Sequence, residues 1–283
     1  MTAIVGFILV IVFVFGGFAV SGGSLLLIFK PWYEYVIIIG AAVGGLVVKS
    51  SPRTLKLVVA KSMGAFKGKL PDRQLYMDSL KLIHDLAYLA RREGLLALEG
   101  HVQAPESSTI FSKYPNILAR TQVLKFITDN LKIVVVGGTN PADLEALMDT
   151  DIETIEEENA TPQQLINNTA DALPALGIVA AVLGIIKTMA SIAEGPEVVG
   201  HKVASALVGT FLGVLFAYGF VGPLATNIEM SNLEDKRLLS VFKTGILGIT
   251  RGMNPKLSAE YARRSIYDGM RPSFEELEEG LKG

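Results

Sequence analysis

The distribution of apolar residues along the chain predicts four membrane-spanning helices. One stretch without a charged residue runs from Val203 to Ile228. A helix needs about 20 residues to cross a hydrocarbon core about 30 Å thick, so this stretch is long enough to span a bilayer. Three further spans are expected at about Ala3–Val20, Tyr35–Val48 and Asp171–Ala193, and the second of them is the shortest. The pattern predicts an all-α integral membrane protein with four transmembrane helices.

Two of the predicted spans contain a proline, Pro174 in the third and Pro223 in the fourth. Proline removes one backbone hydrogen bond and kinks a helix. Lipid tolerates this only where neighbouring groups or water satisfy the freed carbonyl. The two prolines therefore indicate a packed pair of helices that bends. Glycines four residues apart, at Gly40 and Gly44 and again within the fourth span, favour a tight bundle or an oligomer.

Positive charge is concentrated on one side of the predicted spans. The cations that follow span two are Lys49, Arg53, Lys56, Lys61, Lys67, Lys69 and Arg73, and those that follow span four are Lys236, Arg237, Lys243 and Arg251. The two short connections carry only Lys30 and Lys202. Because cytoplasmic loops are enriched in Lys and Arg, both termini and the long middle segment are predicted to be cytoplasmic.

This topology divides the chain into four regions. They are spans one and two (1–50), a cytoplasmic domain (51–165), spans three and four (166–228) and a cytoplasmic C-terminal tail (229–283). The cytoplasmic domain is predicted to be largely helical. Helix starts are expected at Ser51-Pro52, Asn140-Pro141 and Thr161-Pro162, because each pairs a capping residue type with proline at the first helical position. Ser273 and Glu276 have the spacing of a capping box.

Two cytoplasmic segments allow more than one interpretation. Residues Ile133–Val136 are too few for periodicity to distinguish a strand from a helix. The acidic segment from Asp149 to Glu158 is interpreted as a solvated helix face.

A charged stripe is predicted on a helix spanning Asp78–Glu99, which displays Arg91, Arg92, Glu93 and Glu99. On one continuous helix, Arg92 and Glu99 would lie about 20° apart and Arg91 and Glu99 about 80° apart. Exposed charges of this kind usually contribute little to stability. A second interpretation is a surface that steers a charged partner, since charge complementarity sets encounter and register.

Little in the sequence suggests enzymatic chemistry. Half of the residues are hydrophobic and there is no cysteine, which excludes thiol catalysis and cysteine metal sites. No phosphate-binding or dinucleotide fingerprint is present, and the three histidines are scattered without ligand spacing. We expect neither a metabolic enzyme nor a bound cofactor.

The predicted spans have no Asp or Glu in their interiors, and Glu34 is expected at the edge of span two beside aromatic anchors. Intramembrane acids mark ion and proton pathways. Either the chain moves no ions, or a partner supplies the acid. Thr188, Ser205, Thr210 and Tyr218 could offer hydroxyl groups to such an acid, although hydroxyls in membrane helices more often bond to the helix itself.

Several segments closely resemble the MotA family of bacterial flagellar motor stator subunits, which is related to TolQ and ExbB. They read DALPALGIVAA (171–181), VGTFLG (208–213), AYGF (217–220) and GPLA (222–225). The resemblance extends along essentially the whole chain. It implies a pentamer around two copies of a single-span, peptidoglycan-anchored MotB-like partner in the bacterial inner membrane, with no nucleic acid involved. The partner would supply the ion-carrying Asp, and the ring would push the rotor protein FliG.

The resemblance also assigns roles to particular residues. Pro174 and Pro223 match the two functional prolines of the family, and Thr210 matches a hydroxyl near the partner's Asp. Arg91 and Glu99 match the charged pair that engages the rotor. Sodium-type relatives tend to have Thr where this chain has Ala181. Since a methyl group offers no oxygen to a dehydrated cation, protons are expected rather than sodium.

Three other functions are less compatible with the sequence. An ExbB- or TolQ-like energy-coupling subunit is the main alternative, but those relatives have three spans. A self-contained channel or transporter would need an intramembrane acid. A membrane scaffold is opposed by the family resemblance alone.

Overall fold

The computed structural model describes residues 2–67, 70–190 and 192–282, and within these it is helical throughout. Two residues used in the predictions above, Lys69 in the basic cluster and Ser191 in the third span, lie outside the described residues. The chain forms two compact units, Met1–Gly68 with Asn159–Met230 and Lys69–Glu158 with Ser231–Gly283. The all-helical fold predicted from the sequence is confirmed.

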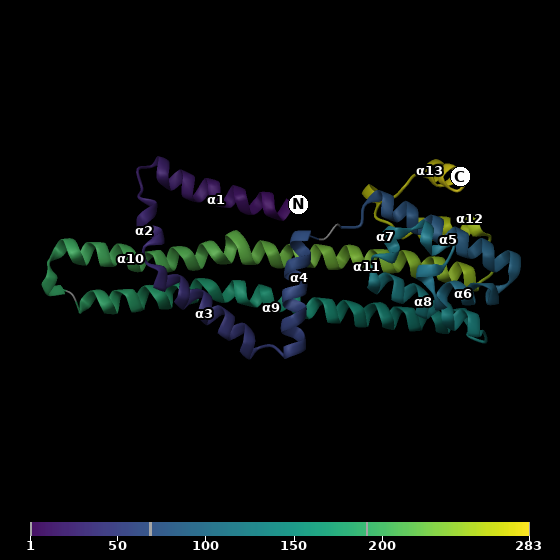
Figure 1. The fold of residues 1–283 in the computed structure, drawn as a ribbon, viewed down its shortest axis with the longest axis horizontal. Coiled ribbons are helices and arrows are strands. Elements are labelled where there is room, and N and C mark those ends of the chain that lie inside the picture. Colours follow the sequence, from purple (N-terminus) through teal and green to yellow (C-terminus); the bar gives the residue numbers. More distant parts are fainter. Residues whose placement is uncertain (1, 68–69, 191, 283) are drawn as a thin grey trace. The chain divides into compact units, whose positions relative to one another are not determined.

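The first unit contains the apolar helices (Figure 1). Its helices are α1 (Thr2–Val20), α2 (Leu25–Phe29), α3 (Trp32–Val48), α4 (Pro52–Lys67), the later part of α9 (Pro141–Met189), η4 (Ile192–Glu194), α10 (Pro196–Leu215), the π-helix η5 (Phe216–Val221) and the first part of α11 (Gly222–Thr250). Among the described residues, three helical stretches are long and apolar enough to cross a membrane: Ala3–Val20, a part of Pro141–Met189 and a part of Pro196–Thr250. The remaining predicted span, span two, corresponds to α3, which is also apolar and has 17 residues, the lower end of the range for a span.

Glycine allows the backbones of α9 and α10 to touch. A Cβ atom at Gly177 would lie 2.7 Å from the carbonyl oxygen of Gly209, and one at Gly213 would lie 2.6 Å from that of Leu173. Any larger residue would push the helices apart, so the glycine spacing noted in the fourth span serves a contact within the chain. Gly40 and Gly44 of α3, in contrast, face open space.

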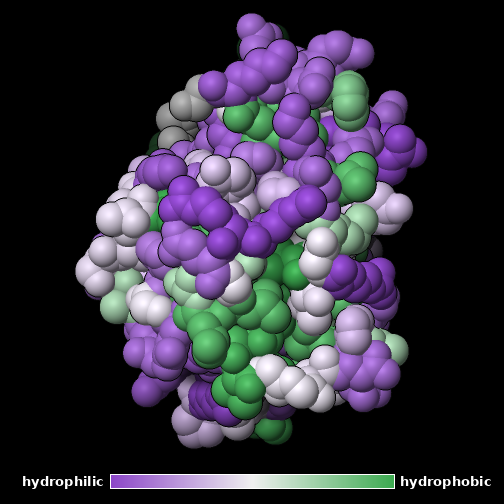
Figure 2. All heavy atoms as spheres, turned by 90° about the vertical axis from the view of Figure 1, so that its right-hand side faces the viewer, coloured by the Kyte–Doolittle hydropathy of each residue, from purple (hydrophilic) through white to green (hydrophobic). Residues whose placement is uncertain are grey.

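The second unit is built from shorter helices around a separate apolar core. They are α5 (Arg73–Glu93), η1 (Leu95–Leu98), α6 (Glu99–Gln103), η2 (Pro105–Ser107), η3 (Phe111–Lys113), α7 (Pro115–Leu118), α8 (Thr121–Val136), α12 (Pro255–Arg264), η6 (Asp268–Met270) and α13 (Phe274–Gly280), together with the remaining parts of α9 and α11. Tyr76, Phe111, Phe126 and Phe242 are its largest fully buried side chains. Figure 2 shows that hydrophilic residues cover most of one face around a smaller hydrophobic area. This face is therefore compatible with exposure to solvent.

Most of the predicted helix starts are confirmed. Ser51 and Asn140 each accept a backbone hydrogen bond at the start of a helix that begins with proline, and Ser273 forms the capping box with Glu276. Residues Ile133–Val136 are helical and end α8.

The predicted helix start at Thr161-Pro162 is wrong, because Pro162 lies inside the continuous helix α9. An interior proline costs about 3 kcal/mol, and packing on both sides of this point offsets the loss. Ile166, one turn later, is buried with Ala225 and Ile228 of α11.

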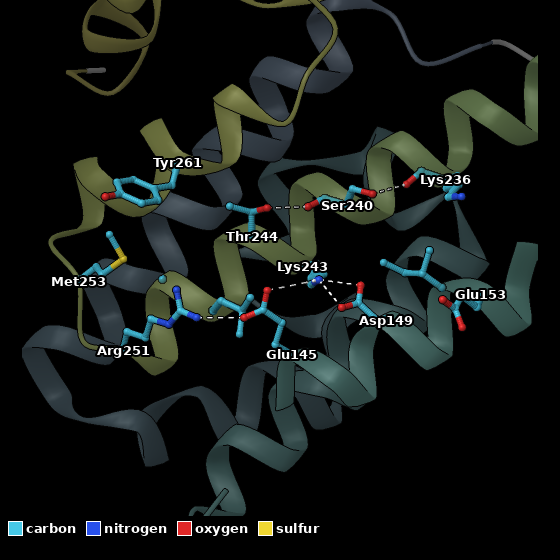
Figure 3. A pocket seen from close by; sticks show the side chains of 13 residues that line it. Glu145, Asp149, Glu153, Lys236, Ser240, Lys243, Thr244, Arg251, Met253 and Tyr261 are labelled. Atoms are coloured by element: carbon cyan, nitrogen blue, oxygen red, sulfur yellow. Dashed lines mark hydrogen bonds and ion pairs between the residues drawn. The ribbon is translucent and has the colours of Figure 1, made fainter. Parts of the chain in front are cut away.

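The acidic segment of α9 is more than a solvated face, because several of its side chains pair with basic residues of α11 (Figure 3). Asp149 lies 2.6 Å from Lys243, and Glu156 lies 2.5 Å from Lys236. Glu145, one turn before the segment, lies 3.1 Å from Arg251. Each exposed pair is worth at most about 1 kcal/mol, so together they chiefly fix the register of the two helices.

Candidate functional site

The crossing of α9 and α10 includes Ala181 and lies one residue from Thr210, two of the predicted ion-pathway residues. Ala181 of α9 is buried, and its backbone nitrogen would lie 3.0 Å from a Cβ atom at Gly209. Thr210 follows Gly209 directly on α10 and is half-buried. Tyr218 lies about two helical turns further along, within η5, and its side chain is 70% exposed. Within a single chain the phenol group therefore points away from the packed interior.

The two predicted hinge prolines lie close to each other. Pro174 is half-buried inside α9, and Pro223 is the exposed second residue of α11. A Cβ atom at Gly222 would lie 4.0 Å from the Cβ of Ala170, and Ala170 is the residue whose carbonyl loses its partner because of Pro174. Both interruptions of the helical hydrogen bonds thus fall at one level of the helix pair.

A π-helix, η5, ends at Val221, two residues before Pro223. Such segments are rare and are frequent at functional sites and hinges. Pro223 has no N–H to donate to the carbonyl of Gly219, four residues earlier, which itself lies in η5. The wider turn accommodates this missing bond. The sequence predicts the kink at Pro223 but contains no signal for the π-helix.

Glu34 is a site residue that sequence reasoning missed. It lies in the first turn of α3, at the edge of predicted span two, and is fully buried within the chain. Its oxygens face two glycines: a Cβ atom at Gly184 would lie 3.2 Å from Oε1, and one at Gly209 would lie 2.7 Å from Oε2. Within the described residues, no group forms a hydrogen bond with either oxygen. Glu34 thus precedes the predicted span two, as expected, but its carboxyl group packs against the helices of the other spans.

The burial of Glu34 follows the helical periodicity of α3. The buried residues of α3 are Glu34, Ile38 and Ala42, which recur every four residues and share one helix face. The aromatic neighbours of Glu34 suggested an interface with water instead.

One basic side chain lies close to this acid. The Nζ atom of Lys187, at the end of α9, lies 4.8 Å from the ring centre of Tyr33, a distance at which a cation is attracted to the ring face. The ammonium group of Lys187 also attracts the carboxylate form of Glu34 electrostatically. The end of α9 thus places a positive charge beside the buried carboxyl.

The charged stripe is not on one helix, so the predicted angles between its residues do not apply. Helix α5 ends at Glu93, and Gly94 turns the chain with a φ of 89°. This left-handed conformation favours glycine. Glu99 begins α6 after the 3₁₀ turn η1. Arg91 and Glu99 are both exposed, but they are carried by different helices.

Arg91 and Arg92 line a groove of about 470 Å³ in the second unit. The other lining residues are His84, Tyr88, Asn254, Pro255 and Lys256. Arg92 forms an ion pair with Glu93 and lies 5.7 Å from the ring centre of Tyr88. Arg91 and Arg92 therefore give this groove a positive wall on α5, whereas Lys256 is paired with Glu278 (3.5 Å) and Glu99 does not line the groove.

Asp85 of α5 forms several contacts with the neighbouring loop. It accepts hydrogen bonds from Lys113 (3.0 Å) and from the hydroxyl of Tyr114 (3.1 Å), and His84 lies 3.6 Å away. Burial raises the pKa of the Asp85 carboxyl, but hydrogen bonds from His84, Lys113 and Tyr114 outweigh it and hold that pKa below its ordinary value of 3.8. The carboxylate therefore ties α5 to the loop that carries Lys113 and Tyr114.

One unit contains long apolar helices, and the other is a helical unit with a largely hydrophilic surface. Together they define a multi-pass, all-helical membrane protein. Two family models match the chain: "Motility protein A N-terminal" over residues 4–94 and "MotA/TolQ/ExbB proton channel family" over residues 119–236. The chain belongs to the MotA/TolQ/ExbB proton channel family, on its motility protein A branch. It is a flagellar channel subunit and not an enzyme.

Individual relatives match the chain over its whole length. Motility protein A of Salmonella typhimurium is 38% identical over 282 residues, which cover 100% of this chain and 95% of that protein. Motility protein A of Escherichia coli is 37% identical with the same coverage. Chemotaxis protein LafT of Vibrio parahaemolyticus is 34% identical and covers 99% of this chain and 98% of that protein.

Two solved structures share the fold. The Campylobacter jejuni MotAB structure matches with a TM-score of 0.81 at 20% identity and covers 96% of this chain and 98% of that chain. The flagellar MotAB stator complex from Bacillus subtilis matches with a TM-score of 0.75 at 23% identity and covers 92% and 93%.

The depressed pKa of Asp85 leads to a prediction about stability and pH. Its stabilising contacts are fully present above about pH 3.8 and are lost as the pH falls through the lower pKa of the folded state. Replacing Asp85 by Asn should lower the free energy of unfolding at pH 7 by about 1–2 kcal/mol, and the difference from the natural protein should shrink in acid. Chemical unfolding of the detergent-solubilised protein at a series of pH values measures this. Asp129→Asn, which alters an exposed pair with Lys132, is the control, and a difference that persists unchanged into acid would contradict the assignment.

Proposed function

We propose that this chain is the stator subunit that couples proton flow across the bacterial inner membrane to torque on the flagellar rotor. The observation that carries the proposal is the whole-chain similarity to motility proteins A, which includes the apolar helices and the second unit alike. An ExbB- or TolQ-like role is the alternative within the family, and the match of residues 4–94 to the motility protein A model favours the flagellar role.

The chain is proposed to act in a complex with a MotB-like subunit, because both similar solved structures are of MotAB complexes. In this proposal five copies surround two single-span partners that are anchored to peptidoglycan and supply the ion-carrying Asp. Both termini and the second unit lie in the cytoplasm, in agreement with the basic residues after spans two and four.

The proton pathway is proposed to run beside the crossing of α9 and α10. Thr210 offers a hydroxyl group one residue after Gly209, which meets the backbone of Ala181, and the exposed phenol of Tyr218 is accessible to a partner helix. A dehydrated sodium ion requires several oxygen ligands, and the methyl group of Ala181 provides none. Protons are therefore the proposed ion.

Torque is proposed to arise from bending at Pro174 and Pro223. Each proline leaves one backbone hydrogen bond unmade, Pro174 in α9 and Pro223 in α11. Both gaps, and the π-helix η5 that joins α10 to α11, lie at one level of the helix pair. A helix pair weakened at a single level can bend there and move the rest of the helices as rigid rods.

The rotor protein FliG is proposed to contact the exposed charges of the second unit. Arg91 lies in the positive groove, and Glu99 presents a negative charge on a separate helix. Opposite charges on separate elements can recognise a partner with the complementary arrangement.

The proposed function is tested by rotation of tethered cells that lack their own stator. Supplying this chain with the MotB-like protein of the same genome should restore rotation that persists without sodium and stops with a protonophore. A complex that inserts and binds its partner but never turns the motor would contradict the flagellar role and favour the ExbB/TolQ-like alternative.

Replacing Pro223 by Leu should leave insertion and partner binding intact but abolish torque. Leucine restores an N–H that can bond to the carbonyl of Gly219, so the π-helix can convert to a regular α-helix that no longer bends. Rotation speed is measured in the same tethered cells. Pro162→Leu, at an interior proline of α9 with no assigned role, is the matched control. Normal speed in the Pro223 variant would contradict the hinge.

Reversing Arg91 and Glu99 together should weaken rotor engagement more than either reversal alone. Because Gly94 separates their helices, the two side chains act on the partner independently, and a double reversal cannot restore a mutual pair. We expect each single reversal to reduce swarming by about half, with partial rescue by charge changes in FliG. Lys132→Glu on α8 is an exposed control. A double variant that recovers normal swarming would contradict this arrangement.

A further inference from the structure

The carboxyl group of Glu34 lies where three helices meet in the first unit. Helix α3 packs against α10, and the carboxyl reaches the contact between α9 and α10. Glycine on each of these helices, Gly184 and Gly209, leaves the space that the two oxygens occupy. A methyl group on Gly209 would lie within 2.7 Å of Oε2, so the carboxyl is seated in a fitted site.

Within the chain this site is closed to solvent, and few polar groups surround the carboxyl. Glu34 is 0% exposed, and no described residue donates a hydrogen bond to it. The groups around it are few: α9 contributes the positive charge of Lys187, α3 contributes the phenol of Tyr33, and α10 contributes Ala206 and Gly209, which carry no titratable group. A carboxylate ion without hydrogen-bond donors is strongly disfavoured in such surroundings.

The site is also directly connected to the proposed ion pathway. Gly209, which contacts Oε2, directly precedes Thr210 and approaches the backbone of Ala181. Ionisable residues within membrane helices are costly and mark ion or proton pathways. If position 34 had only a structural role, an apolar side chain of similar size would stabilise the packing better than a glutamate.

We propose that Glu34 is a second proton-binding carboxyl of the channel, contributed by this chain in addition to the partner's acid. It holds a proton while α3 is seated against α9 and α10. When this contact opens to water, the carboxyl O–H bond breaks and the proton passes to water as hydronium, and the reverse step reloads the site. This inference rests on the proposed function, because the opening is the helix movement that accompanies rotation.

The proposal implies a coupling between proton loading and helix packing. The neutral carboxyl fits the dry site, whereas the ionised form favours separation of α3 from the two glycines. Lys187, at the end of α9, attracts the ionised form and offers it a position nearer to water. Loading and release can thereby bias the packing of the same helices that carry Pro174 and Pro223.

The test uses the full complex of this chain with its MotB-like partner. Glu34→Gln keeps the shape of the side chain but cannot exchange a proton, and Glu34→Asp keeps an acid. We expect the glutamine variant to assemble but to turn several-fold more slowly, with a flattened dependence of speed on external pH, and the aspartate variant to recover part of the speed. Glu197→Gln removes an exposed carboxylate in the first turn of α10 and should leave the speed unchanged.

A second measurement does not depend on rotation. Infrared spectra of the reconstituted natural complex should contain a protonated-carboxyl band that shifts in heavy water and is absent in Glu34→Gln. A glutamine variant that turns at normal speed at every pH would overturn the proposal, as would a natural complex without this band. Failure of the natural chain to restore rotation, with the band present, would instead count against the proposed function alone.

Discussion

The direct backbone contact between α9 and α10 is the constraint on which the first unit depends. Gly177, Gly209 and Gly213 have no side chain at the crossing, so the backbone of one helix approaches the backbone of the other directly. In lipid, helix association relies on such close packing, because the surrounding chains are as apolar as the helix surfaces. The positions of Ala181, Thr210 and Glu34 all follow from this contact.

A helix pair with such a close crossing can move only where its hydrogen bonds are already incomplete. Pro174 and the segment formed by η5 and Pro223 provide this at one level. The remaining turns are regular helix and behave as stiff rods. The membrane part therefore combines one tight contact with one weakened level, an arrangement that suits a subunit whose helices shift while they stay associated.

The second unit owes its stability to a core of its own. Phe111, Phe126 and Phe242 are fully buried there, and paired charges along α9 and α11 fix the register of these two helices. Its exposed arginines and glutamates contribute little to folding.

The helical class, the membrane segments and most helix starts could be predicted from the sequence, since run length and capping depend on residues close together in the chain. It also located Pro174 and Pro223. It could not show that Gly94 ends α5, that Pro162 stays inside α9, or that Glu34 is buried. The end at Gly94 depends on the positive φ that this glycine adopts, and the other two features depend on packing against distant residues, as Glu34 packs against Gly184 and Gly209.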